Sequence, residues 1–214
     1  FILLAAFLLS CSENIPPVDD ALEKQILLFG NGSEPQGLDP HIVTGVPEHH
    51  LLISMCEGLT IANPKGGDNL PGVAETWKIS PDGTTYTFYL NKNAKWSNGD
   101  ALTAQDFVWS WMRILTPSLG SQYPDMLYYV KGAADFHQGK TDDFSTVGVK
   151  AINDHELRVE LKNPTPFFIR LLSHYSTYPV HKETVLAHGS IDDRNGLWTR
   201  PGNFVCNGPM NLKS

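Results

Sequence analysis

The sequence has few basic side chains, few cysteines and no long apolar segment. Its 214 residues carry 16 Lys and Arg against 23 Asp and Glu, for a net charge of -7. This balance argues against a nucleic-acid-binding protein, which needs a basic surface to neutralise phosphates. The hydrophobic share of 41% excludes a disordered chain. Residues 1–9 form an apolar run, but a membrane-spanning helix needs about 20 such residues.

Catalytic and metal-binding motifs are also missing from the sequence. It contains no HExxH, GxSxG, Walker A or GxGxxG motif. Its eight histidines follow no ligand spacing, and its paired aspartates are typical of turns and helix caps. We therefore predict no enzyme activity, no cofactor and no metal site, and a secreted metallohydrolase stays a third alternative without a ligand set.

The first 21 residues are typical of an export signal followed by a lipid-anchored tether. Residues 1–10 fit the apolar region of a secretory signal peptide without its charged start, so we expect a truncated beginning. Ser10 and Cys11 resemble the lipobox of bacterial lipoproteins, in which the cysteine sulfur carries a diacylglycerol. Residues 11–21 are mostly polar and suit a tether. The alternative is a buried N-terminal helix with a chance cysteine.

Two further cysteines, Cys56 and Cys206, lie far apart in the sequence. In an exported protein such a pair could form a disulfide. Their wide separation gives no geometric support for one, and Cys56 lies in an apolar helical stretch. We therefore expect two buried free thiols, with the disulfide as the alternative.

Periodicity and turn signals predict a mixed α/β (α+β) domain without a regular repeat. We predict strands at residues 25–29, 85–90 and 157–161, the second paired in a hairpin across the turn at 80–83. We predict helices at residues 48–59, from the Thr103 cap to Pro117, and at 123–136, 166–172 and 181–187.

Several segments carry a resemblance to a known family. Residues 71–77 (PGVAETW), 82–90 (DGTTYTFYL), 94–99 (AKWSNG) and 102–108 (LTAQDFV) resemble the signature region of family 5 bacterial extracellular solute-binding proteins, which serve ABC importers. Residues 31–41, 45–48, 147–151 and 207–208 resemble the branch that binds oligopeptides or murein tripeptide. The resemblance covers residues 22–214.

The resemblance implies a two-lobed fold of the type II periplasmic-binding-protein kind, with an accessory domain in one lobe. Residues 22–56 would begin lobe I, residues 57–181 would form the accessory domain, and residues 182–214 would return into lobe I. The whole second lobe and the last part of lobe I would be missing, so we expect an N-terminal fragment of a longer protein.

The resemblance also implies a binding site. Family members hold an extended peptide between the lobes through main-chain hydrogen bonds, as in strand addition. The pairing edge of lobe I falls on Thr44, Gly45 and Val46, and a tyrosine that bonds the peptide matches Tyr123; an ordinary surface aromatic is the alternative for Tyr123. Thr44 replaces an acidic residue that members can carry, which removes the basis for a preference for cationic peptides.

The implied function is capture of short peptides outside the cytoplasmic membrane and their delivery to an ABC permease and ATPase complex. Within the family, the alternatives are binding of a nickel chelate, haem or murein peptide. A cell-surface interaction lipoprotein without a transport role is an alternative of a different class. We expect a monomer in the periplasm or cell envelope, attached to the membrane through the lipid anchor, with no nucleic-acid partner.

Overall fold

The computed structural model describes residues 17–213. The predicted signal segment at residues 1–10 and the predicted lipidation site Cys11 lie outside this range. The chain divides into two compact units, Phe1–Ser33 and Glu34–Ser214, and each is described by itself. The described helices are all too short or too polar to span a bilayer.

The described part of the first unit contains one short helix, α1 (Pro17–Glu23), followed by an extended apolar segment. The strand predicted at residues 25–29 is wrong, because no strand forms there and Leu27, Leu28 and Phe29 are each more than half exposed. A strand needs a neighbour that takes up its N–H and C=O groups. The described part of this unit holds no second strand that could do so.

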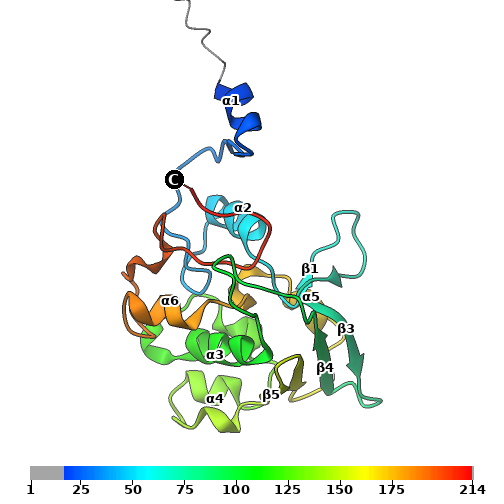
Figure 1. Ribbon diagram of the computed structural model, residues 1–214. Helices are drawn as coiled ribbons and strands as arrows, with labels where there is room; N and C mark the ends of the chain where they lie inside the picture. The colour runs from blue at the N-terminus through cyan, green and yellow to red at the C-terminus, as the bar shows by residue number, and fades with distance from the viewer. Residues whose placement is uncertain (1–16, 214) are drawn as a thin grey trace, which may run out of the picture. The chain divides into compact units, whose positions relative to one another are not determined.

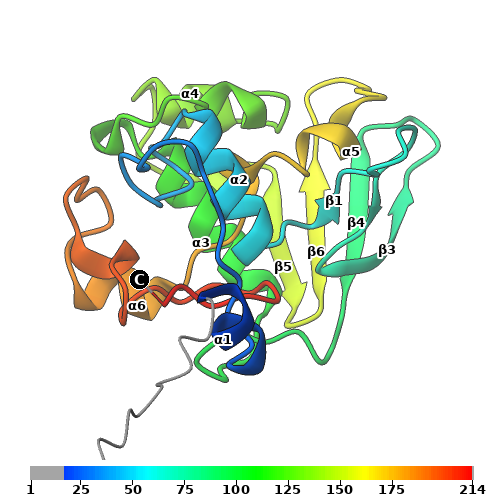
Figure 2. The same cartoon turned by 90° about the horizontal axis from the view of Figure 1, so that it is seen from above.

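The second unit is built around a four-stranded antiparallel sheet with the order β3-β4-β6-β5 (Figure 2). The strands are β3 (Ala74–Ile79), β4 (Thr85–Leu90), β5 (Val149–Asn153) and β6 (Glu156–Glu160). The predicted hairpin is confirmed: Trp77 pairs with Phe88, and Gly83 closes the turn with a φ of 70°. A small second sheet pairs β1 (Thr60–Ile61) with β2 (Leu70–Pro71).

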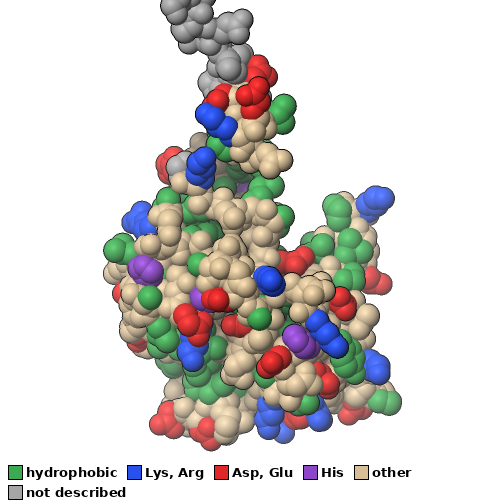
Figure 3. Space-filling model, viewed as in Figure 1, with side chains coloured by type: hydrophobic (Ala, Val, Ile, Leu, Met, Phe, Trp, Pro, Cys, Tyr) green, Lys and Arg blue, Asp and Glu red, His purple; other side chains and the backbone are tan. Residues whose placement is uncertain are grey.

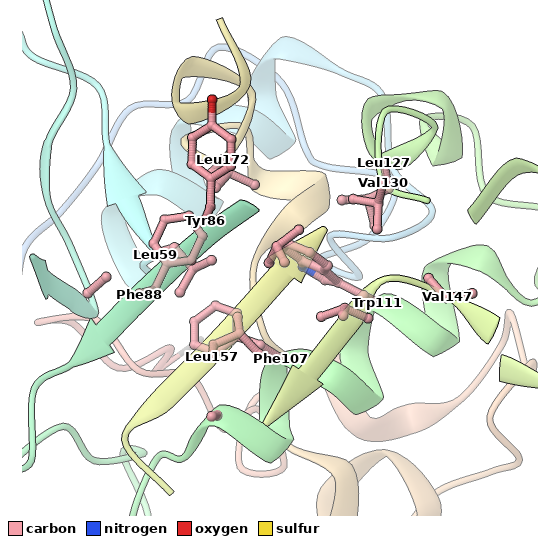
Figure 4. Close-up of a cluster of buried hydrophobic side chains, with 14 of the residues drawn as sticks. Leu59, Tyr86, Phe88, Phe107, Trp111, Leu127, Val130, Val147, Leu157 and Leu172 are labelled. Atoms are coloured by element: carbon pink, nitrogen blue, oxygen red, sulfur yellow. The ribbon is translucent and has the colours of Figure 1, made fainter. Parts of the chain in front are cut away.

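Helix α3 (Ala104–Leu115) packs along the sheet beside β5 and β6 (Figure 2). Its start is as predicted: the Asp106 carboxylate accepts the backbone N–H of Thr103 at 2.7 Å, in a capping box. Phe107 and Trp111 lie on its apolar face and are at most 1% exposed, which confirms Trp111 as a core residue. Figure 4 shows them in one cluster with Phe88 and Leu157 from the sheet.

The remaining helices of the second unit are short. They are α2 (Val46–Met55), α4 (Ala133–His137), α5 (Phe168–Leu171) and α6 (Lys182–Ala187), with 3-10 turns η1 (Pro117–Leu119), η2 (Pro124–Leu127), η3 (Phe144–Thr146), η4 (Tyr175–Thr177) and η5 (Leu197–Thr199). The single helix predicted at residues 123–136 is wrong, since η2 and α4 replace it. Gly132 separates them with a φ of 73°, and a side chain there would collide with the Thr146 carbonyl oxygen.

A buried ionic group ties the start of this unit to α3. Arg113 is fully buried, and its guanidinium donates to both oxygens of Asp39, at 2.9 and 2.6 Å. It also lies 3.0 Å from Nδ1 of His41, whose Nε2 lies 3.1 Å from the Tyr178 carbonyl oxygen. This geometry fits a neutral imidazole that donates from Nε2 and accepts at Nδ1. Burial and the Arg113 charge lower the pKa of His41 to about 4.

The expectation of two free thiols is wrong, because Cys56 and Cys206 form a disulfide with a Cα–Cα distance of 5.4 Å. The fold brings them together by placing the segment after residue 204 beside the end of α2 (Figure 1). The side-chain amide of Asn207 both accepts from Glu57 N–H at 3.0 Å and donates to the Glu57 carbonyl oxygen at 2.9 Å. Gly208 N–H donates to the Met55 carbonyl oxygen. The wide separation of the two cysteines in the sequence was therefore a poor guide to whether they form a disulfide.

Candidate functional site

The predicted pairing edge is a short extended segment that runs into a helix. Thr44 is exposed, and Gly45 has an extended backbone with φ and ψ of -83° and 159°. Val46 is the first residue of α2, and its side chain is 66% exposed. At a helix start the amide N–H groups lack intrahelical partners, so Val46 can offer an N–H but its carbonyl faces into the helix. Gly45 therefore has the extended backbone shape that strand addition requires, although its carbonyl oxygen already accepts the His49 N–H of α2.

The buried side chain of Glu48 supports the segment at residues 44–46. Glu48 is 4% exposed, and its Oε1 accepts the backbone N–H of Gln36 at 2.7 Å. A Cβ atom at Gly45 would overlap the Glu48 carboxylate, so that carboxylate occupies the space where a side chain would stand. Glycine at position 45 therefore allows the carboxylate to hold residue 36 and the start of α2 together.

Tyr123 lies in an aromatic group that reaches the same segment. Its half-buried ring meets the ring of His174 edge-on at 5.2 Å and the ring of Tyr175 at 6.3 Å. Tyr175 is 2% exposed, and its hydroxyl donates to the Val43 carbonyl oxygen at 3.0 Å. The ring of His49, from α2, lies 5.6 Å from that of Tyr175. The fold thus brings the predicted edge and the predicted tyrosine into one site.

Burial favours the uncharged forms of His49, His174 and Tyr175 in this site. Burial, together with the neighbouring His50, lowers the pKa of His49. Burial and the neighbouring His49 lower the pKa of His174. Burial, with contributions from Tyr123 and Glu48, raises the pKa of Tyr175 to about 12. An uncharged aromatic and backbone surface suits recognition of a peptide main chain better than recognition of a particular charge.

Sequence reasoning missed the residues that support the edge: Glu48, His49, His174 and Tyr175. Glu48 carried no usable signal, because the cap residue is Gly45 and the carboxylate accepts the N–H of Gln36, twelve residues away. Tyr175 carried none, since its contact with Val43 spans 132 residues.

A separate concave surface lies at the starts of α3 and α6. It is lined by Trp96, Asp100, Asp106, Trp109 and His181, among others. Nε2 of His181 lies 3.1 Å from Asp100, while its Nδ1 accepts the Thr184 N–H. In the described part of the chain, no group of three His, Cys, Asp or Glu side chains is arranged to hold a metal ion. The prediction of no metal site stays a prediction.

Comparison with known sequences relates the chain to binding proteins of bacterial importers. Residues 70–214 match the family described as "Bacterial extracellular solute-binding proteins, family 5 Middle". The chain is 43% identical over 202 residues to the periplasmic oligopeptide-binding protein OppA of Escherichia coli, covering 94% of this chain and 36% of the relative. It is 36% identical over 214 residues to the periplasmic murein peptide-binding protein MppA of Escherichia coli, covering 99% and 38%.

Solved structures agree with the sequence comparison. Haemophilus influenzae OppA in complex with the peptide RPPGFSPFR is similar with a TM-score of 0.76 and 38% identity, over 83% of this chain and 34% of that one. The unliganded open form of the murein tripeptide-binding protein MppA gives a TM-score of 0.77 and 38% identity, over 85% and 34%. This similarity confirms the mixed α/β fold class as part of a periplasmic binding protein.

The chain spans about a third of the length of the relatives it matches. The boundaries predicted for lobe I and the accessory domain stay predictions, because contacts within Glu34–Ser214 make it one compact unit. The matched residues include both strands of the predicted hairpin, the capped helix α3 and Tyr123. The chain belongs to the family 5 bacterial extracellular solute-binding proteins.

Proposed function

We propose that this chain is part of the substrate-binding component of an ABC importer that captures short peptides outside the cytoplasmic membrane. Thr44, Gly45, Val46 and Tyr123 would form one wall of the peptide site. The observation that supports this most is that Tyr175 contacts both the ring of Tyr123 and the carbonyl oxygen of Val43, the residue before Thr44 and Gly45. The relatives at 43% and 36% identity are named for oligopeptide and murein peptide binding, which favours ligand capture over catalysis.

The wider assignment follows the family. Residues 22–56 and 182–214 would belong to lobe I and residues 57–181 to the accessory domain. Cys11 would carry a lipid anchor that keeps a monomeric protein in the periplasm or cell envelope, within reach of a permease and ATPase complex. The family-level similarity to periplasmic binding proteins supports the location outside the cytoplasm.

Ligand identity tests the proposal directly. The complete reading frame that contains this chain should be purified under native conditions, denatured, and its released ligands identified by mass spectrometry. We expect short peptides of mixed sequence, because main-chain pairing is indifferent to side chains. Release of a nickel chelate or haem without peptides would contradict the peptide assignment.

Murein peptide is a second candidate because the murein peptide-binding relative aligns over 99% of this chain. Calorimetry with murein tripeptide and with a neutral tripeptide separates the two. Tighter binding of the murein tripeptide by tenfold or more would favour this candidate, and equal affinities would favour a general peptide carrier.

Position 44 allows a sharper test of where the ligand lies. In the same protein, Thr44→Glu places a carboxylate on an exposed residue of the edge. We expect affinity for a lysine-containing tripeptide to rise about 2- to 5-fold relative to a neutral one, as for a solvent-exposed ion pair. Thr76→Glu, on an exposed residue of β3, is the matched control and should change neither affinity. Equal effects of the two variants would place the ligand elsewhere.

A further inference from the structure

Tyr175 joins the two halves of the proposed site from inside the protein. It comes from η4, whereas Val43 precedes α2 and Tyr123 precedes η2. Its ring is buried in a cluster with Leu38, Leu52 and Tyr178, so it cannot serve as an open contact for a ligand. Its hydroxyl nevertheless donates to the Val43 carbonyl oxygen, one residue before the exposed edge.

The direction of this hydrogen bond follows from the number of protons. A tyrosine hydroxyl has one proton to donate and lone pairs that can accept. Tyr175 gives its proton to the Val43 carbonyl oxygen, and its ring also meets the ring of Tyr123 edge-on at 6.3 Å. Because the pKa of Tyr175 is raised to about 12, the proton stays on Tyr175 throughout the physiological range.

We infer that Tyr175 is a positioning residue that orders the backbone at Val43–Gly45 and holds the ring of Tyr123 in place beside the bound peptide. The inference rests on the proposed function. Tyr175 reaches both parts of the site, through its hydrogen bond to the Val43 carbonyl oxygen and through its ring contact with Tyr123. Ring contacts support it: His174 stacks on Tyr175 at 4.4 Å and meets Tyr123 edge-on at 5.2 Å, so both phenol rings are held in place.

The chain offers a matched control for the loss of this hydroxyl. Tyr178 lies in the same buried cluster, is 3% exposed, and its hydroxyl donates to the Ser173 carbonyl oxygen at 3.1 Å. Tyr175→Phe and Tyr178→Phe each remove one buried hydroxyl-to-carbonyl hydrogen bond and keep the ring. Both should lose a similar amount of stability, but only Tyr175→Phe should disturb the site.

The first experiment uses this chain without ligand. Backbone ¹⁵N relaxation should show lower order at Thr44 and Gly45 in Tyr175→Phe, and unchanged order there in Tyr178→Phe. Equal order in both variants would overturn the positioning role. This measurement does not depend on peptide binding, so it decides the role of Tyr175 even if the proposed function fails.

The second experiment measures peptide affinity in the product of the complete reading frame. We expect Tyr175→Phe to weaken binding about 3- to 10-fold, the range for one hydrogen bond, and Tyr178→Phe to leave it unchanged. Equal losses of affinity in Tyr175→Phe and Tyr178→Phe would show that Tyr175 contributes only to stability. Absence of any peptide binding would overturn the proposed function itself.

Discussion

The sheet with α3 and the region around α2 are held together in different ways. In the first, apolar side chains of the sheet and of α3 are buried against one another, as Phe88 and Phe107 are. In the second, polar contacts join residues far apart: Asp39 with Arg113, Val43 with Tyr175, and Glu57 with Asn207. The comparison shows that the frame of this protein is held by apolar burial, whereas its candidate site depends on individual polar pairs between residues far apart in the sequence.

Acidic and basic side chains are interspersed over the face shown in Figure 3. Exposed ion pairs such as Lys140 with Asp135, at 2.9 Å, contribute little because water and salt screen them. The electrostatic terms that matter for stability are therefore the buried ones, and the buried pair Arg113–Asp39 lies at the boundary between the two regions.

The largest effect on stability is expected from removing a side chain of the core between α3 and the sheet. Phe107→Ala removes a fully buried ring between α3 and the sheet and should lower the free energy of unfolding by about 4 kcal/mol. Chemical denaturation monitored by tryptophan fluorescence measures this. The exposed Phe167 supplies the control, since Phe167→Ala should cost far less. Similar losses for both would contradict a core centred on α3.

Removing the carboxylate that faces Arg113 comes next. Asp39→Ala leaves a fully buried guanidinium without its ion-pair partner and should cost about 3 kcal/mol. We place it at the low end of the range for such losses because His41 and the Trp198 ring remain beside the guanidinium. A loss below about 1 kcal/mol in the same denaturation assay would show that residues 38–41 are not anchored by this pair.

Acid should weaken the same long-range contacts. The pKa of His41 is about 4 in the folded protein against an ordinary 6.5, so the unfolded chain binds more protons between these values. The contribution of His41 is complete above pH 6.5 and is lost as the pH falls towards 4, by about 2–3 kcal/mol. Denaturation midpoints over this range measure it. His41→Asn should flatten this part of the profile, and an unchanged slope would refute the assignment.

The smallest effect is expected at the start of α3. Asp106→Ala removes the carboxylate that accepts the Thr103 N–H and should cost about 1 kcal/mol, the usual value for a helix cap. Asp106→Asn keeps an oxygen acceptor and should lose less. If both variants lost as much stability as Asp39→Ala, Asp106 would support more of the fold than the start of α3.

Prediction from sequence succeeded for features set by nearby residues and failed for contacts between distant ones. The hairpin around Gly83, the capped helix α3 and strand β6 were predictable because each depends on periodicity and turn chemistry within a few residues. The pairing of Cys56 with Cys206 and the contact of Tyr175 with Val43 were not, because no local pattern encodes a partner more than 100 residues away.

Two errors have a related cause. Residues 25–29 have the composition of a strand, but pairing requires a neighbour, and the described part of the first unit supplies none. The single helix predicted at residues 123–136 failed because the backbone turns at Gly132, which has a left-handed φ of 73°. Within the site, Thr44, Gly45 and Tyr123 came from family resemblance, whereas the residues that hold them in place became visible only in three dimensions.

The two hydrogen bonds between the Asn207 side chain and the Glu57 backbone bear on how the disulfide forms during synthesis. Cys56 is synthesised before Cys206. The two cysteines have a sequence separation of 150, so the thiol of Cys56 has no partner until the residues between them have been made. A loop of that length closes slowly by chance encounter. Docking of the Asn207 amide onto residue 57 would bring the second thiol beside the first without any covalent bond. Non-covalent assembly would thus select the correct partner, and oxidation would then make that choice permanent.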